Sequence, residues 1–270
     1  MLERVLDVVF PRRCAGCGSG PWPFCAECVR RVVPLAPPWC DRCGSPASGQ
    51  VVSCRDCPPA PLARARAPFL FEGPVRSSVH RLKFSGWRAV ADALGGAMAQ
   101  VTPGPADAVT WVPLSRRRQA ERGFDQAKAL ALVVARELDL PARPMLRRSG
   151  DDDGTQARRG GEARRAAMRG RFAHLGPGPA PARVLLVDDV LTTGATAASC
   201  ADALQAGGAV EVSLLVAARA VKVGGPRGYT RRGLVPGSVV ARGTSPRKSM
   251  PAAGKATHVR RPLVAEHGAV

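Results

Sequence analysis

Four Cys-x-x-Cys pairs set the strongest constraint on how this chain can fold. They hold eight of its nine cysteines and lie within residues 14–60, a segment rich in proline and glycine with little apolar periodicity. Such a segment cannot build a hydrophobic core and needs another source of stability. A Cys-x-x-Cys turn directs two thiolates to one point, and two such turns complete a tetrahedral zinc site. The pairs are Cys14 and Cys17, Cys25 and Cys28, Cys40 and Cys43, and Cys54 and Cys57.

Eight thiolates fit two zinc sites of four ligands each. Sites with no open coordination position are structural, and metal binding then contributes the folding free energy that the small module lacks. We expect the first two pairs to share one zinc ion and the last two to share another; a single site with the other pairs idle is the alternative. Gly18 and Gly44 each follow a pair, where a knuckle turn often needs a positive φ. Cys200 stands apart and is predicted to be a small core residue.

The N-terminal residues indicate whether the cysteines are reduced, because an export signal would direct the protein to an oxidising compartment. Charged side chains at Glu3, Arg4 and Asp7 interrupt any apolar run, so residues 1–13 predict a short amphipathic helix and no signal peptide. No stretch approaches the roughly 18 apolar residues of a membrane span. We therefore expect a cytoplasmic protein whose cysteines bind metal, rather than a disulfide scaffold or a redox Cys-x-x-Cys protein.

Residues 61–220 alternate apolar runs with helical patterns. The run Val184–Val187 is continuous rather than alternating, as expected of a strand buried on both faces of a parallel sheet. Strand, helix and strand in succession imply a right-handed crossover. The predicted fold class is α/β, with a parallel-sheet domain preceded by a small cysteine-rich zinc module. Expected strands are 108–112, 184–187 and 210–217, and expected helices are 123–138 and 195–206.

The charge of the chain is strongly positive. A formal net charge of +19 over 270 residues attracts polyanions such as nucleic acid, phosphorylated metabolites or an anionic membrane surface. Residues 221–270 lose the apolar pattern and contain a single acid, so they predict a disordered basic tail. The alternative is that the charge reflects the overall arginine-rich composition and this basic tail, rather than a surface that binds polyanions. We expect three regions: the cysteine module at 1–60, the α/β domain at 61–220 and the tail at 221–270.

The segment Val184–Thr196 has the pattern of a phosphate-binding loop. An apolar strand delivers two adjacent carboxylates, Asp188 and Asp189, to its carboxyl end, where they can accept hydrogen bonds from ribose hydroxyls or hold Mg²⁺ through water. Small residues then turn into a helix, so that backbone N–H groups and the helix dipole can surround a phosphate. An ordinary turn with a threonine N-cap is the alternative. The predicted phosphate-binding residues are Thr192, Thr193, Gly194, Ala195 and Thr196.

This segment resembles the ribose-5-phosphate loop of type I phosphoribosyltransferases, which bind phosphoribosyl diphosphate with Mg²⁺. Residues 111–126 (WVPLSRRRQAERGFDQ) resemble the "VPVP…RGFNQ" block of the ComF family of competence proteins. Residues 82–84 (LKF) resemble that family's "LKY" segment, and parts of 155–172 resemble its next block. With the cysteine module in front, the resemblance covers about residues 1–220. It implies a phosphoribosyltransferase-like domain behind a double zinc ribbon.

The resemblance also implies roles for individual residues. Asp188 and Asp189 would be the catalytic pair, with Mg²⁺ accompanying the ligand. Phosphoribosyltransferases place a diphosphate loop after an earlier strand, and guanidinium groups suit diphosphate because they bind two oxygens. A solvated arginine-rich face is the alternative. The candidates for the diphosphate are Lys83, Arg116, Arg118 and Arg122, with Arg117 in the same cluster.

Two further features bear on the site, the first from the composition of a segment rich in arginine and glycine and the second from the family pattern. Residues 147–171 look like a lid over the site. Asp125 stands where the family usually has Asn, and Ala167 stands near another such position. If those amides bind ligand or brace the loop, binding here would be weaker.

Three functions remain open at this point. The chain could be a phosphoribosyltransferase that expels diphosphate through an oxocarbenium-like transition state, with Mg²⁺ and arginines stabilising the leaving group. It could bind single-stranded DNA during natural transformation beside a DNA-uptake helicase, as the ComF resemblance implies. It could also sense phosphoribosyl diphosphate or a nucleotide without turnover. Aromatic residues available for stacking on bases are Trp22, Trp39, Trp87 and Trp111.

Overall fold

The computed structural model describes residues 13–84, 89–148 and 170–221. The predicted opening helix at 1–13 and the predicted tail at 221–270 lie outside these ranges, apart from one residue of each. Most of the lid segment 147–171, including Ala167, also lies outside them, as does Trp87.

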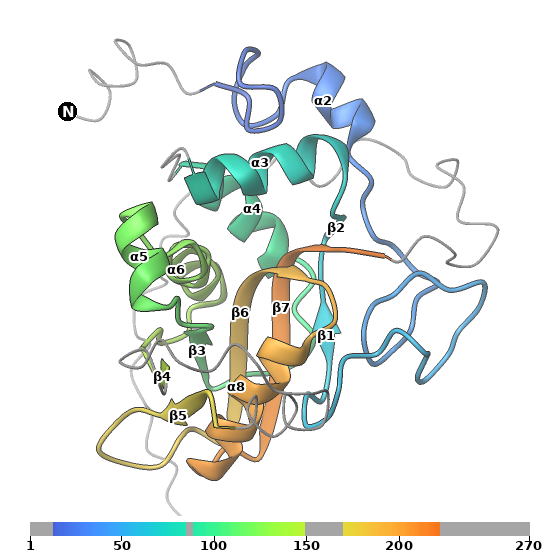
Figure 1. Cartoon of the computed structure of the whole chain (residues 1–270). Helices are drawn as coiled ribbons and strands as arrows, with labels where there is room; N and C mark the ends of the chain where they lie inside the picture. Colours follow the sequence, from blue (N-terminus) through green and yellow to red (C-terminus); the bar gives the residue numbers. More distant parts are fainter. Residues whose placement is uncertain (1–12, 85–88, 149–169, 222–270) are drawn as a thin grey trace, which may run out of the picture.

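A parallel sheet forms the centre of the molecule (Figure 1). Its strand order is β1-β7-β6-β3, and β2 also pairs with β7. Every one of these pairs is parallel. The two longest strands, β6 and β7, are buried along most of their length, which explains their continuous apolar runs. The strands are β1 (Ala65–Arg66), β2 (Phe69–Leu70), β3 (Ala108–Trp111), β6 (Arg183–Leu191) and β7 (Glu211–Arg219).

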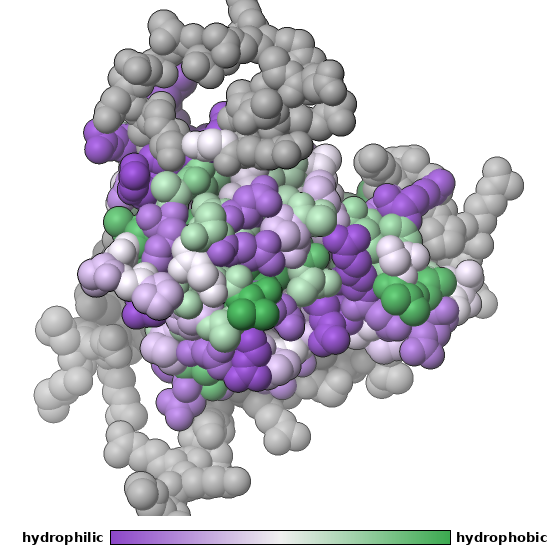
Figure 2. Space-filling view, turned by 90° about the horizontal axis from the view of Figure 1, so that it is seen from below, coloured by the Kyte–Doolittle hydropathy of each residue, from purple (hydrophilic) through white to green (hydrophobic). Residues whose placement is uncertain are grey.

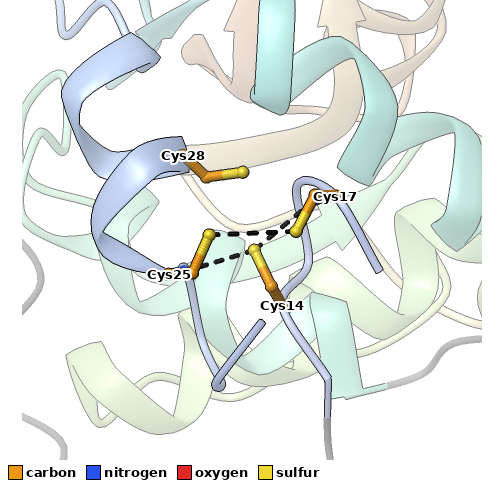
Figure 3. Close-up of side chains that lie close together, drawn as sticks. All are labelled: Cys14, Cys17, Cys25 and Cys28. Atoms are coloured by element: carbon orange, nitrogen blue, oxygen red, sulfur yellow. Dashed lines mark hydrogen bonds between the residues drawn. The ribbon is translucent and has the colours of Figure 1, made fainter. Parts of the chain in front are cut away.

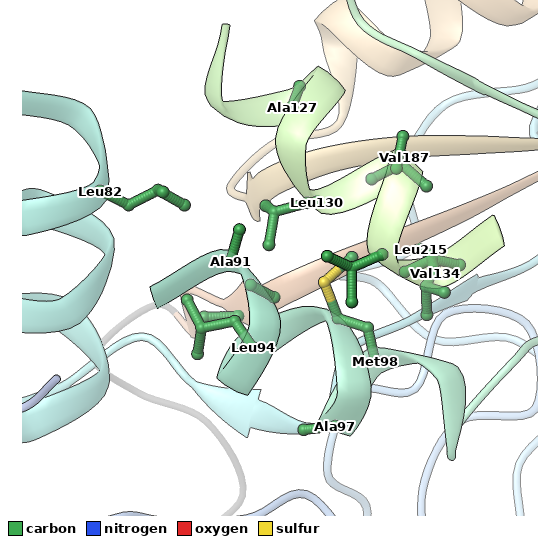
Figure 4. Close-up of a cluster of buried hydrophobic side chains, with 14 of the residues drawn as sticks. Leu82, Ala91, Leu94, Ala97, Met98, Ala127, Leu130, Val134, Val187 and Leu215 are labelled. Carbon is green, nitrogen blue, oxygen red and sulfur yellow. The ribbon is translucent and has the colours of Figure 1, made fainter. Parts of the chain in front are cut away.

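Three helices cover one face of the sheet: α3 (Gly73–Phe84), α4 (Ala89–Ala99) and α6 (Gln126–Leu138). Figure 4 shows side chains of these helices gathered with Val187 of β6 and Leu215 of β7. Helices are expected on both faces of such a sheet, because each face must bury its apolar side chains.

The other face is covered by α8 (Ala195–Ala206), which packs beside a small antiparallel pair formed by β4 (Leu146–Arg148) and β5 (Phe172–His174). Cys200 of α8 is fully buried in this second core. The α/β fold class is therefore confirmed, and the helix expected at 195–206 has the bounds of α8.

The strand β6 is longer than the sequence predicts. It continues to Leu191, because β7 pairs with it as far as Arg219. The two carboxylates Asp188 and Asp189 therefore lie inside the strand and not beyond its end. Since successive strand residues point to opposite faces, the two side chains diverge.

The helix predicted at 123–138 begins later in the structure, at Gln126, and a short helix that was not predicted precedes it. Arg116–Arg122 forms the separate helix α5, which ends at Gly123 with a φ of 70°. Helix α6 begins only at Gln126, because the side chain of Asp125 accepts a hydrogen bond from the N–H of Lys128 and caps it.

The face of the molecule in Figure 2 mixes hydrophilic and hydrophobic residues, and strongly hydrophobic ones form small separate groups. Within the described ranges, the large apolar side chains that are exposed come from different parts of the chain: Val52, Phe84, Leu132, Leu175 and Val210. Among the helices in the described ranges, none has the length and apolar character needed to cross a membrane.

Candidate ligand site and metal centres

The turn between β6 and α8 carries the predicted phosphate-binding residues. Thr192, Thr193 and Thr196 are exposed, whereas Gly194 is buried, has a φ of 75° and forms the N-cap of α8. A Cβ on Gly194 would lie 2.4 Å from the Cβ of Pro58, so both the backbone and the space require glycine here. The N-terminus of a 12-residue helix thus opens beside three exposed hydroxyls. This arrangement suits an anion, because the first N–H groups of a helix lack partners within it.

Asp189 is a buried charged group of the site, with 6% relative exposure. Nζ of Lys83, at the end of α3, lies 2.9 Å from its Oδ1. Nε2 of Gln126, at the start of α6, donates to its Oδ2 at 3.0 Å. Both carboxylate oxygens therefore have protein partners, and Asp189 joins β6 to two helices.

Asp188 has a different environment on the opposite face of β6. Its Oδ1 accepts a hydrogen bond of 2.8 Å from the backbone N–H of Asp189, and among the described residues it forms no ion pair. Burial raises the pKa of Asp188 to about 8, and the negative charge of Asp189 adds to the increase. Asp188 is therefore the carboxylate that a cation could recruit without breaking an ion pair.

Of the four basic residues predicted to bind the diphosphate, all of which lie in the described ranges, the structure brings only Lys83 and Arg122 close together. The guanidinium carbon of Arg122 lies 5.0 Å from the ring centroid of Phe84, the residue next to Lys83. Arg116 and Arg118 are exposed on α5, a helix with no buried residue. Nε of Arg117 lies 2.8 Å from the carboxylate of Glu121.

A groove of about 650 Å³ runs along α3 beside Lys83. The ring of Phe84 is 60% exposed and lies 4.7 Å from the ring of His80, measured between centroids. The basic side chains that line the groove are Arg76, Arg81, Lys83 and Arg122. An exposed aromatic ring among cations is a surface suited to a base or a nucleic-acid strand.

Gln126 is a site residue to which the sequence analysis assigned no role. It is 3% exposed, and its amide is directed at Asp189. A polar side chain in line with the apolar residues on the core face of a helix is the signal that could have identified it, because buried polar groups need partners.

The sulfurs of the first four cysteines converge (Figure 3). All four lie within 4.8 Å of one another, and those of Cys17 and Cys25 are 3.8 Å apart. Zn–S bonds of about 2.3 Å at the corners of a tetrahedron place sulfurs about 3.8 Å apart. The N–H groups of Gly20 and Ser19 lower the pKa of Cys17 to about 6, which favours the thiolate that zinc requires.

The last four cysteines form an equivalent cluster. The sulfurs of Cys40 and Cys57, and of Cys43 and Cys54, are 3.6 Å apart. The clusters therefore follow the sequential grouping expected from the sequence. Gly18 and Gly44 have φ values of 84° and 65°, as the knuckle turns require. Four thiolates with no open position fit structural zinc at both clusters.

Comparison with known proteins agrees with this organisation. Residues 5–58 match the family model of the double zinc ribbon domain. The chain is 30% identical over 209 residues to the DNA utilization protein YhgH of Escherichia coli K12, covering 72% of this chain and 89% of that protein. It is 28% identical over 204 residues to the competence protein ComFC of Bacillus subtilis, covering 70% and 81% of the two chains.

Solved structures align with a smaller part of the chain. The glutamine phosphoribosylpyrophosphate amidotransferase of B. subtilis aligns over 47% of this chain and 26% of its own, with 24% identity and a TM-score of 0.36. Adenine phosphoribosyltransferase of Leishmania tarentolae aligns over 54% and 61%, with 18% identity and a TM-score of 0.30. Family membership rests on the curated relatives: this chain belongs to the ComF family, the family of YhgH and the competence proteins.

Proposed function

We propose that the protein binds a phosphoribosyl ligand, phosphoribosyl diphosphate or a nucleotide, at the carboxyl end of β6, and acts in DNA uptake. The observation that carries this proposal is the β6–α8 turn, where two exposed threonines and a buried, left-handed Gly194 precede α8 and a third exposed threonine lies in its first turn. Backbone N–H groups and hydroxyls there suit a 5′-phosphate. The link to DNA uptake is supported by the names of the relatives alone.

Asp188 is the residue that would hold Mg²⁺ or the ribose. Its carboxylate has one hydrogen bond, from the backbone N–H of Asp189, and it forms no ion pair with any residue in the described part of the chain. Mg²⁺ binds through one or two carboxylates and the oxygens of a phosphate ligand, which fits this donor set. When bound, the metal would neutralise charge on the diphosphate.

Lys83 and Arg122 would face the diphosphate from the opposite side. Lys83 is 22% exposed and paired with Asp189, so its ammonium is fixed in position but remains accessible. Fixed cations aimed at a leaving diphosphate are what a phosphoribosyl transfer needs. If the protein transfers the phosphoribosyl group to an acceptor, it is an enzyme. If it binds the ligand without turnover, it is a sensor.

The test is calorimetric titration of the zinc-loaded protein with phosphoribosyl diphosphate and Mg²⁺. Asp188→Asn should weaken binding about tenfold or more, because an amide cannot ionise to give Mg²⁺ a carboxylate ligand. Asp202→Asn, an exposed site on α8, is the matched control and should bind normally. Asp189→Asn is a poorer probe because it also breaks the contact with Lys83. Absence of binding by the wild-type protein would reject the proposal.

A second candidate, binding of single-stranded DNA, is favoured by the groove along α3. Its four basic side chains and the exposed ring of Phe84 combine phosphate contacts with a stacking surface. Phe84→Ala should weaken binding of a labelled oligo(dT), and affinity should fall steeply with salt. Leu132→Ala, an exposed apolar site on α6, is the control. Equal affinity of both variants would exclude the groove.

A further inference from the structure

A second, smaller cavity lies between the phosphate loop and the second zinc ribbon. Its volume is about 100 Å³, well below the roughly 300–1,000 Å³ of a whole small-molecule site. Thr192 and Thr193 line it from the loop, and Arg55, Asp56 and Cys57 line it from the zinc-binding turn. The exposed side chain of Arg55 thus lies across the cavity from the residues that we expect to hold a phosphate.

Arg219, at the end of β7, forms another part of the wall and is only 2% exposed. Its two terminal nitrogens donate to the carbonyl oxygens of Cys43 at 2.9 Å and Asp56 at 2.7 Å. Its Nε is buried and has no hydrogen-bond partner among the residues that the structure describes. A buried guanidinium N–H without a partner is costly, and the positive charge of Arg219 in the cavity wall favours an anion there.

The loop and the second zinc ribbon are also in direct contact. Pro58, the residue after the last zinc ligand, packs so closely against Gly194 that no side chain fits between them. The turn that carries Arg55 is itself defined by Cys54 and Cys57, whose sulfurs are 3.9 Å apart. Zinc at this cluster therefore fixes the turn that faces the phosphate loop.

We propose that the second zinc ribbon is part of the ligand site, with Arg55 and Arg219 binding a phosphate group of the ligand opposite Thr192 and Thr193. The inference rests on the proposed function, because it assumes that the loop binds a phosphorylated ligand. The cavity wall carries two guanidinium groups, those of Arg55 and Arg219, beside the carboxylate of Asp56 and the zinc-ligand sulfur of Cys57. Zinc at the second cluster is required for tight binding because it holds Arg55 in place, whereas zinc at the first cluster is not.

The test compares the affinity of Mg²⁺–phosphoribosyl diphosphate for three zinc-loaded proteins by calorimetry. Arg55→Ala should bind about 10- to 100-fold more weakly than wild type, the cost of losing a charged hydrogen bond. Arg30→Ala is the matched control: Arg30 is an exposed arginine on α2 (Ala26–Arg31), beside the first zinc cluster, and its loss should leave affinity unchanged. Ribose 5-phosphate lacks the diphosphate but keeps the 5′-phosphate. Its affinity should therefore fall by the same factor from wild type to Arg55→Ala.

A second comparison tests the role of zinc. Cys54→Ser with Cys57→Ser should remove one zinc ion per chain and weaken binding at least as much as Arg55→Ala. Cys14→Ser with Cys17→Ser should remove the other ion with little effect on affinity. Zinc content is measured on each protein, and circular dichroism checks that it is folded. If wild type binds and Arg55→Ala binds as well as Arg30→Ala, this inference is wrong while the proposed function stands; if wild type does not bind, both fail.

Discussion

At the scale of single residues, adjacent carboxylates on β6 have different environments. Asp189 is held by Lys83 and Gln126, so three segments that are far apart in the sequence meet at one buried charge. Asp188 points to the other face and is held by a backbone N–H alone among the described hydrogen bonds. Strand geometry explains the difference, because neighbouring side chains must diverge.

Asp189→Asn should destabilise the fold even without ligand. The substitution leaves the partly buried ammonium of Lys83 without its counter-charge, and breaking a buried pair in this way costs about 3 kcal/mol. Urea unfolding of the metal-loaded protein would measure the loss. Lys83→Met with Asp189→Asn should recover part of it, because no unpaired charge remains. An unchanged midpoint for the single variant would show that the pair does not stabilise the fold.

Asp188 makes stability depend on pH. Its pKa is raised to about 8, so the folded state binds a proton that the unfolded state releases near pH 4. The contribution of Asp188 to the free energy of unfolding is therefore fully present below about pH 4. Between about pH 4 and about pH 8 it falls by on the order of 1 kcal/mol per pH unit, because the unfolded state loses its proton first.

Asp188→Asn removes this dependence, because the amide does not titrate. The variant should therefore gain stability relative to wild type between about pH 5.5 and about pH 8.5. Unfolding midpoints of the two proteins at both pH values would measure the change. Parallel pH profiles would contradict the assignment of a raised pKa.

At the scale of elements, helix α6 shows how a departure from the family pattern is accommodated. The family resemblance predicts Asn at the position of Asp125, whose side chain caps α6. Asn and Asp are about equally good N-caps, so the structural role survives the change. Burial raises the pKa of Asp125, which means that its ionised form is held at a cost.

Two substitutions at Asp125 should distinguish the effect of its N-cap hydrogen bond on stability from the effect of its negative charge. Asp125→Ala should lower the free energy of unfolding by about 1 kcal/mol, because the N–H of Lys128 loses its acceptor. Asp125→Asn should be neutral or slightly stabilising near neutral pH, because an amide avoids the desolvation of a carboxylate. Chemical denaturation of both variants would check this, and equal losses would argue against a capping role.

At the scale of the whole molecule, the two zinc ribbons contact the α/β domain at separate places. Arg81 of α3 donates to the carbonyl oxygens of Ala15 and Gly16 in the first ribbon. Arg219 of β7 donates to carbonyl oxygens of the second ribbon. In both cases an arginine from the domain holds backbone carbonyls whose positions depend on the zinc knuckles.

Removing zinc should therefore destabilise the α/β domain as well as the ribbons. A chelator strong enough to strip both ions should lower the melting temperature, because the ribbons have no core of their own to hold these carbonyls in place. Adding Zn²⁺ back should restore it, whereas adding Mg²⁺ should not, since thiolates are poor ligands for a hard cation. A zinc-free protein that melts at the original temperature would show that the arginine contacts are not needed.

The sequence by itself determined the parts that depend on local spacing. Paired cysteines predicted two zinc clusters and their grouping, and a continuous apolar run followed by small residues predicted the β6–α8 unit. These predictions succeed because each depends on residues close together in the chain, where spacing alone fixes the geometry.

The tertiary structure alone decided which distant residues meet. The sheet order brings β6 beside β7 and β3, and only then do Lys83, Gln126 and Asp189 come into contact. The placement of Arg55 beside the β6–α8 turn likewise depends on how the second ribbon docks against β7. Packing and hydrogen bonding across the fold set such contacts, and sequence spacing carries no information about them.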